Sequence, residues 1–159
     1  MREKILMLIE RNAKLTAKEA AVLLGEDEEK VAAEIKKMEE ENIICGYHTM
    51  INWNLMPEEK ADAIIEVKVA PQRGVGFDRI AERIWQYPEV EGIYLMSGSF
   101  DFAIFLQGKS MREVAMFVAE KLSTLDSILS TSTQFVLKKY KDHGVVMAKN
   151  EKDERISIS

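Results

Sequence analysis

Apolar residues in the first sixty positions recur at helical spacing in three short runs. Each run places its apolar residues on one face, which is the pattern of an amphipathic helix. The first run predicts a helix over about residues 2–12, and the other two runs follow within the next thirty residues. The apolar positions are Ile5, Leu6, Leu8 and Ile9, then Ala20, Ala21, Leu23 and Leu24, then Val31, Ile35 and Met38.

Polar residues and a glycine between these runs mark where the second and third helices begin and end. Thr16, with Glu19 three positions later, has the arrangement of a capping box. Gly25 is expected to end the second helix, because glycine readily takes the positive φ found after a helix C-terminus. Asp27 is expected to cap the third helix. Three helices, the last two joined by a glycine-containing turn, predict a winged-type helix-turn-helix over residues 1–52.

A β-prone segment over residues 43–51 leads into a predicted hinge at 53–60, after which the pattern changes. Alternation at Ile65, Val67 and Val69 predicts a strand, and helical spacing from Phe77 to Trp85 predicts a helix. Two further strands follow, then a helix opened by a second capping box, and then a last strand over residues 128–140. The resulting order is βαββαβ. The chain is therefore predicted to be an α+β protein, with a ferredoxin-like domain over residues 61–140.

The strand predicted after the turn at Gly98 is apolar on both faces. Phe100, Phe102, Ile104 and Leu106 fall on one side, while Ala103 and Phe105 fall on the other. In a ferredoxin-like domain the helices cover only one face of the sheet, so the second face needs another cover. The simplest cover is a second copy, which predicts a homodimer joined through its sheets.

The tail over residues 141–159 has two open interpretations. Its apolar stretches at residues 145–147 and 156–159 are candidates for additional edge strands or for packing on a neighbouring subunit. The equally favoured alternative is a frayed terminus.

The charge of the third helix opposes the helix-turn-helix prediction. Residues 25–44 contain eight acidic and three basic side chains, a net charge of −5 that equals the charge of the whole chain. A DNA duplex is a dense line of negative charge, and neutralising its phosphates supplies most non-specific affinity. A three-helix packing module without a nucleic-acid partner therefore stands as the alternative. If DNA is bound, we expect weak phosphate contact compensated by oligomeric avidity.

Little else in the composition indicates chemistry. Cys45 is the one cysteine, so an intramolecular disulfide or a cysteine zinc site is impossible, and His48 and His143 have no metal-ligand spacing. We expect no metal, no cofactor and no enzymatic activity. The N-terminal apolar run is too short and too charged for a signal peptide or a membrane span, so a cytoplasmic protein without membrane contact is predicted.

Several segments together resemble the Lrp/AsnC (leucine-responsive, feast–famine) family of transcription regulators. The resemblance spans about residues 2–140, and it lies in the order and spacing of the segments rather than in one motif. The segments are Ile5-Leu6-x-Leu8-Ile9, Val31-x-x-x-Ile35-x-x-Met38-Glu39, Ile43-Ile44-Cys45-Gly46-Tyr47, the turn Gly98-Ser99-Phe100-Asp101 with the family's G-x-x-D pattern, and Thr131-Ser132-Thr133.

The resemblance implies a regulator that binds double-stranded DNA as dimers, assembles into tetramers or octamers, and responds to an amino acid or similar metabolite. The implied DNA-binding residues are Thr16, Lys18, Asp27, Glu28, Lys30, Ala33, Glu34 and Lys37. At position 34 the family often carries Arg or Lys, so Glu34 is expected to replace a phosphate contact with repulsion.

The implied effector pocket lies between dimers and is formed by Ser97, Gly98, Ser99, Asp101, Thr131 and Thr133. Its chemistry is plausible, because a carboxylate accepts from an α-ammonium and exposed backbone amides donate to an α-carboxylate. Two alternatives remain beside the regulator. One is a small-molecule-sensing module that has lost DNA binding, and the other, less favoured, is an enzyme like the haem-precursor decarboxylases that resemble this family.

Overall fold

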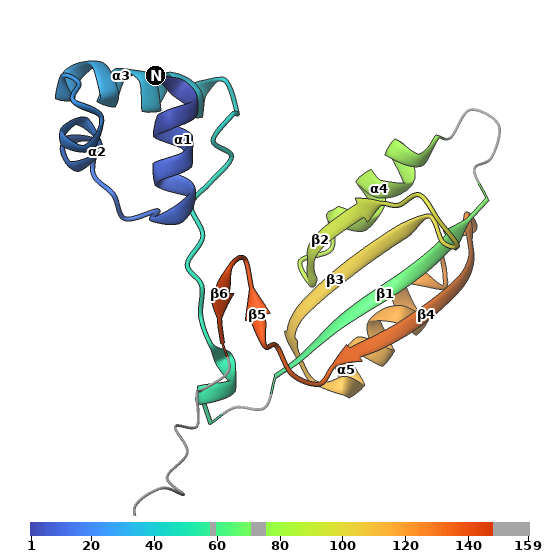
Figure 1. Ribbon diagram of the computed structural model, residues 1–159. Helices are drawn as coiled ribbons and strands as arrows, with labels where there is room; N and C mark the ends of the chain where they lie inside the picture. Colours follow the sequence, from blue (N-terminus) through green and yellow to red (C-terminus); the bar gives the residue numbers. More distant parts are fainter. Residues whose placement is uncertain (58–59, 71–75, 148–159) are drawn as a thin grey trace, which may run out of the picture. The chain divides into compact units, whose positions relative to one another are not determined.

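The computed structural model describes residues 1–57, 60–70 and 76–147 and divides into two compact units, one at Met1–Ile51 and one beginning at Asn52 (Figure 1). Helices occupy the first unit, and an antiparallel sheet with two helices forms most of the second. The predicted α+β class is confirmed, with a helix-turn-helix followed by a ferredoxin-like domain. In the described residues, no helix has the length and apolar character needed to cross a membrane.

The first unit contains α1 (Arg2–Arg11), α2 (Ala17–Leu24) and α3 (Glu28–Glu40). Its core is formed by apolar side chains from all three helices, and the most buried are Ile5, Ala20, Val31 and Met38. The prediction that Leu23 packs in this core is wrong, since 63% of Leu23 is exposed. Leu23 lies about 200° around the helix from the buried Ala21, which places it on the solvent side of α2.

The second unit begins with the short helix η1 (Trp53–Leu55) and continues as β1 (Ala61–Val69), α4 (Phe77–Trp85), β2 (Val90–Leu95) and β3 (Phe102–Lys109). After β3 come α5 (Met111–Phe117), the π-helical turn η2 (Val118–Leu122) and β4 (Ile128–Val136). The four strands form one antiparallel sheet in the order β2-β3-β1-β4. The last strand is shorter than predicted, because its pairing with β1 ends where Val136 meets Asp62.

The core of the second unit lies between one face of this sheet and the helices α4 and α5. Strand residues at alternate positions join helix residues in a single buried cluster, so both helices cover the same face. Its members are Ala63, Ile65, Val67, Val69, Ile80, Ile84, Phe102, Ile104, Leu106, Val114, Phe117 and Leu122.

The other face of the sheet carries apolar side chains, as predicted from the alternation in β3. Ile64 pairs with Phe105 and Tyr94 pairs with Ala103, so these residues share the face that is opposite the core. Tyr94 and Phe105 contact each other edge to face, with ring centroids 5.3 Å apart. Both rings remain accessible, with 57% of Tyr94 and 37% of Phe105 exposed. Phe100 precedes β3 and lies in the turn.

Two predicted strand segments differ in the structure. Residues 43–51 form no strand, because a β-ladder needs a partner and none is supplied to this segment by the described part of the chain. After β4, β5 (Lys141–Asp142) and β6 (Val145–Val146) form a separate two-stranded hairpin. The amide of Asn52 donates to the carbonyl of Met147 at 2.9 Å and ties this hairpin to the start of the unit. The apolar stretch at 156–159 lies outside the described residues.

Candidate nucleic-acid interface and effector site

The start of α2 and the turn between α2 and α3 are set by capping interactions that the sequence predicts. The Thr16 hydroxyl accepts from the Glu19 N–H at 3.2 Å, and the Glu19 carboxylate accepts from the Thr16 N–H at 2.8 Å. Gly25 ends α2 with a φ of 66°, in the left-handed region. Asp27 then accepts from the Lys30 N–H at 3.1 Å and caps α3. These contacts fix how α3 leaves the turn.

An exposed row on α3 is the natural candidate for contact with DNA. Lys30, Ala33 and Lys37 are all exposed and recur at i, i+3 and i+7, to one side of the buried Val31 and Met38. The row offers two ammonium groups for phosphates and a methyl group small enough for close approach to a base edge.

The other predicted DNA-binding residues are distributed around this row. Lys18 is exposed on α2, and Glu28 is exposed in the first turn of α3. Thr16 and Asp27 use their side chains as helix caps, so a structural role accounts for both of them. Of the predicted set, the structure thus places Lys30, Ala33 and Lys37 on one surface, with Lys18 on the preceding helix.

Glu34 has an environment that the sequence did not reveal. Its side chain is only 21% exposed and forms an ion pair with the Nε of Arg2, the first residue of α1. Arg2 also donates through Nη1 and Nη2 to the carboxylate of Glu41, at 2.7 and 3.2 Å. The carboxylate at position 34 is therefore paired within the unit, and its predicted repulsion of DNA phosphates stays a prediction. The hydrogen bond from Arg2 keeps the pKa of Glu41 below its ordinary value.

Further acids of α3 also have cationic or hydroxyl partners. Lys36 lies 3.9 Å from Glu40 and Lys37 lies 3.9 Å from Glu41, each one helical turn apart. The Tyr47 hydroxyl donates to Glu39 at 2.7 Å, which raises the pKa of Tyr47. Lys36 and Lys37 are already counted in the net charge of −5 and Tyr47 is neutral, so among these partners only Arg2 adds positive charge to the surface of α3. Arg2 and Tyr47 were missed because they lie far from their partners in sequence.

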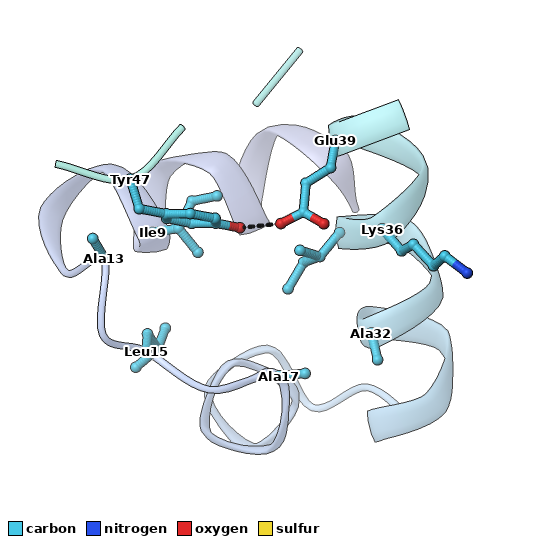
Figure 2. A pocket seen from close by; sticks show the side chains of 9 residues that line it. Ile9, Ala13, Leu15, Ala17, Ala32, Lys36, Glu39 and Tyr47 are labelled. Carbon is cyan, nitrogen blue, oxygen red and sulfur yellow. Dashed lines mark hydrogen bonds between the residues drawn. The ribbon is translucent and has the colours of Figure 1, made fainter. Parts of the chain in front are cut away.

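The Tyr47–Glu39 contact borders an open groove of about 300 Å³ in the first unit (Figure 2). Three alanines leave room for the groove, and Lys36 and Glu39 are its charged members. Its lining residues are Ile9, Ala13, Leu15, Ala17, Ala32, Ile35, Lys36, Glu39 and Tyr47.

The predicted effector residues fall on the β2–β3 connection and on β4. Ser97, Gly98 and Ser99 are exposed in the connection, and Gly98 has a φ of 156°. Asp101 is held firmly beside β1, since its N–H donates to the Val67 carbonyl at 2.9 Å. Its Oδ2 accepts from the Val69 N–H at 2.8 Å, so one carboxylate oxygen has a structural role.

Thr131 and Thr133 lie on the opposite side of β1 from this connection. Thr131 pairs with Val67 and Thr133 pairs with Ile65, so both threonine side chains are on the helix-covered face, where they are half-buried. The structure brings Asp101 and Thr131 to the same end of β1, because both residues flank Val67. Thr133 lies two residues further along β4, on the same face of the sheet.

Metal chemistry has no visible basis in the part of the chain that the structure describes. No three His, Cys, Asp or Glu side chains gather there as a metal site. His143 is exposed beside Asp142, with its Nδ1 2.8 Å from the carboxylate, and Cys45 is exposed with its Sγ 3.2 Å from the Asn42 carbonyl.

A helix-turn-helix joined to a ferredoxin-like domain defines a class of transcription regulator, and comparisons with known proteins identify the family. The model of the Lrp/AsnC ligand binding domain matches residues 62–146. The HTH-type transcriptional regulator YugG of Bacillus subtilis is 45% identical over 98% of this chain and 95% of its own length. The proline dehydrogenase transcriptional activator of Rhodobacter capsulatus is 29% identical over 77% of this chain and 79% of its own. The chain belongs to the Lrp/AsnC family of helix-turn-helix transcriptional regulators.

Solved structures share the fold at low sequence identity. AsnC of E. coli has a TM-score of 0.64 at 22% identity and covers 86% of this chain and 89% of its own. The regulator NMB0573 of Neisseria meningitidis, solved in complex with L-Met, has a TM-score of 0.69 at 21% identity and covers 87% of this chain and 89% of its own.

Proposed function

We propose that this regulator binds specific DNA sites through the exposed α3 row, Lys30, Ala33 and Lys37, with Lys18 contributing from α2. The observation that carries the proposal is the row itself: two ammonium groups flank a small side chain on an exposed stripe of α3. The ion pairs from Arg2 to Glu34 and Glu41 support the proposal, because they offset part of the negative charge beside the row. A regulator with DNA as its partner would act in the cytoplasm, and we assign it no enzymatic step.

We further propose that an amino acid or related metabolite binds near the β2–β3 connection. Asp101 has one oxygen engaged with Val69, and its other oxygen, Oδ1, is suited to accept from an α-ammonium. Backbone amides around Gly98 and Ser99 suit an α-carboxylate, and Thr131 and Thr133 would supply hydroxyls from β4, on the other side of β1. The L-Met complex of the Neisseria regulator supports this ligand class.

The uncovered sheet face supports self-association as part of the same function. Ile64, Tyr94 and Phe105 form an apolar surface that a second copy would bury by pairing sheet against sheet. A dimer would bring together two α3 rows and so compensate for modest affinity at each. Assembly of such dimers into tetramers or octamers remains a prediction.

Fluorescence anisotropy tests the proposal directly. The full chain is titrated against labelled DNA from upstream of its own gene, at low and at physiological salt, with unlabelled competitor present. We expect competitor-resistant binding that weakens as salt rises, because phosphate contacts release counterions. Repeating the titration with each of the twenty amino acids should identify one that shifts the midpoint.

Two outcomes would contradict parts of this proposal. Absence of competitor-resistant binding at both salt concentrations would favour a sensing module that has lost DNA binding. DNA binding that no amino acid changes would leave the DNA-binding role standing and reject the effector class. Lys37→Gln serves as the interface variant, with Lys4→Gln on α1 as the control that loses the same charge.

A further inference from the structure

Arg2 is placed where a cation should be unfavourable. It is the first residue of α1, and the N-terminus of a helix carries partial positive charge from the aligned peptide dipoles. The structure shows what offsets this, since the guanidinium spans two acids of α3. Nη1 and Nη2 donate to the two oxygens of Glu41 at 2.7 and 3.2 Å, and Nε pairs with Glu34.

The two acids lie directly beside the exposed α3 row. Glu34 is one helical turn from Lys30, and Glu41 is one turn from Lys37. Any phosphate that reaches the lysine ammonium groups therefore passes close to both carboxylates. Without Arg2, Glu41 would still lie 3.9 Å from Lys37, but both carboxylates would act against the attraction of the lysines for phosphate, because like charges a few ångströms apart repel.

We propose that Arg2 is a positioning residue for DNA binding, which masks Glu34 and Glu41 and so allows the acidic helix α3 to approach phosphates. The inference rests on the proposed DNA-binding function and deepens it. Arg2 contacts α3 in this role, and it acts on DNA only through the charge and placement of that helix. The sequence departure at position 34 is thus compensated within the same unit, by a residue thirty-two positions away.

The geometry requires an arginine. A guanidinium presents several N–H groups in a fixed plane, so one side chain can meet both oxygens of Glu41 and also reach Glu34. A lysine carries the same charge at a single point and has no second edge with which to bridge. Substituting lysine therefore separates the effect of charge from the effect of the bridge.

The test compares two substitutions that remove the same charge from the same helix. Arg2→Gln breaks the bridge, whereas Lys4→Gln changes an exposed residue elsewhere on α1. We expect Arg2→Gln to weaken DNA binding about tenfold at 0.1 M salt, roughly the worth of one phosphate contact, and Lys4→Gln to weaken it about twofold. The triple variant Arg2→Gln/Glu34→Gln/Glu41→Gln should return to within about threefold of the unsubstituted protein, because the unmasked charges are gone.

Each outcome bears on the inference. Equal affinities for Arg2→Gln and Lys4→Gln would overturn it, and so would a triple variant as weak as Arg2→Gln, which would indicate a purely structural loss. Circular dichroism and thermal unfolding verify the fold of each variant. If Arg2→Gln is unfolded, Arg2→Lys against Lys4→Arg makes the same comparison at constant charge, with weaker DNA binding expected for Arg2→Lys alone.

The proposed function and this inference fail in different ways. If the unsubstituted chain binds no DNA, both are rejected. If it binds its operator and the Arg2 variants match their controls, only the masking role is rejected.

Discussion

The two units of the chain reach stability by different means. The sheet unit has a continuous apolar core between strands and helices, and it also has aromatic rings on its uncovered face. The helical unit has a smaller core, built around Ile5, Val31 and Met38, in about fifty residues. Domains of this size bury a limited share of their surface, so caps and ion pairs between helices matter more in the helical unit.

The difference shows which kind of interaction carries function in each unit. In the helical unit, the charges that we propose to control access to DNA also join α1 to α3. In the sheet unit, the buried apolar residues on one face of the sheet stabilise the fold. The apolar residues on the other face form the surface that we propose for association. A substitution should therefore affect different properties depending on the unit and the face.

Removing a ring from the core of the sheet unit should have the largest effect on stability. Phe102 is 2% exposed and contacts Phe77 edge to face, with ring centroids 6.0 Å apart. Phe102→Ala should lower the free energy of unfolding by about 3–5 kcal/mol, through lost burial and a residual cavity. Urea denaturation followed by circular dichroism measures the loss.

The control for this prediction is an aromatic residue on the surface of the same unit. Tyr140 is 66% exposed, and Tyr140→Ala should cost no more than about 1 kcal/mol. Similar losses in the two variants would contradict the assignment of the core.

The sequence predicts the core of each unit better than it predicts the contacts between elements. Alternation in β1 and β3 and helical spacing in α4 indicate the buried residues, because periodicity reports burial directly. The end of β4 at Val136 depends on the pairing register with β1, which the sequence of β4 alone does not specify.

The candidate sites show the same limit. Asp27 and Thr16 are recognisable as caps because their partners lie three residues away. The Arg2–Glu34 pair joins residues thirty-two positions apart, so no local pattern reveals it. The sequence therefore predicts a repulsive carboxylate at Glu34 without its partner. The engagement of Asp101 with Val69 is equally distant in sequence.

Placing a charge on the uncovered sheet face should change association without unfolding the chain. Phe105 is 37% exposed and packs on Tyr94, so Phe105→Asp would put a carboxylate at the centre of the proposed dimer surface. Sedimentation velocity at micromolar concentration should show a dimer for the unsubstituted chain and mainly monomer for this variant.

The matched control makes the same apolar-to-acid change in the other unit. Leu23 is 63% exposed on α2, and Leu23→Asp should leave the dimer intact. A monomeric unsubstituted chain, or a Phe105→Asp variant that still dimerises, would contradict the sheet-to-sheet proposal.

Acid should weaken the helical unit by a smaller, graded amount. Hydrogen bonds from the Thr16 backbone and hydroxyl lower the pKa of Glu19 below its ordinary 4.5, and the hydrogen bond from Arg2 does the same for Glu41. Because the folded pKa values lie below the unfolded ones, the unfolded chain binds more protons at low pH. The stabilisation is complete above the unfolded pKa and is lost as pH falls through the folded pKa.

Thermal unfolding midpoints should therefore fall as pH drops below 4.5, and Glu19→Gln should flatten that dependence. Glu10→Gln, an exposed change on α1, should keep the dependence of the unsubstituted chain, and an equally steep fall in Glu19→Gln would show that the capping carboxylate contributes nothing to it.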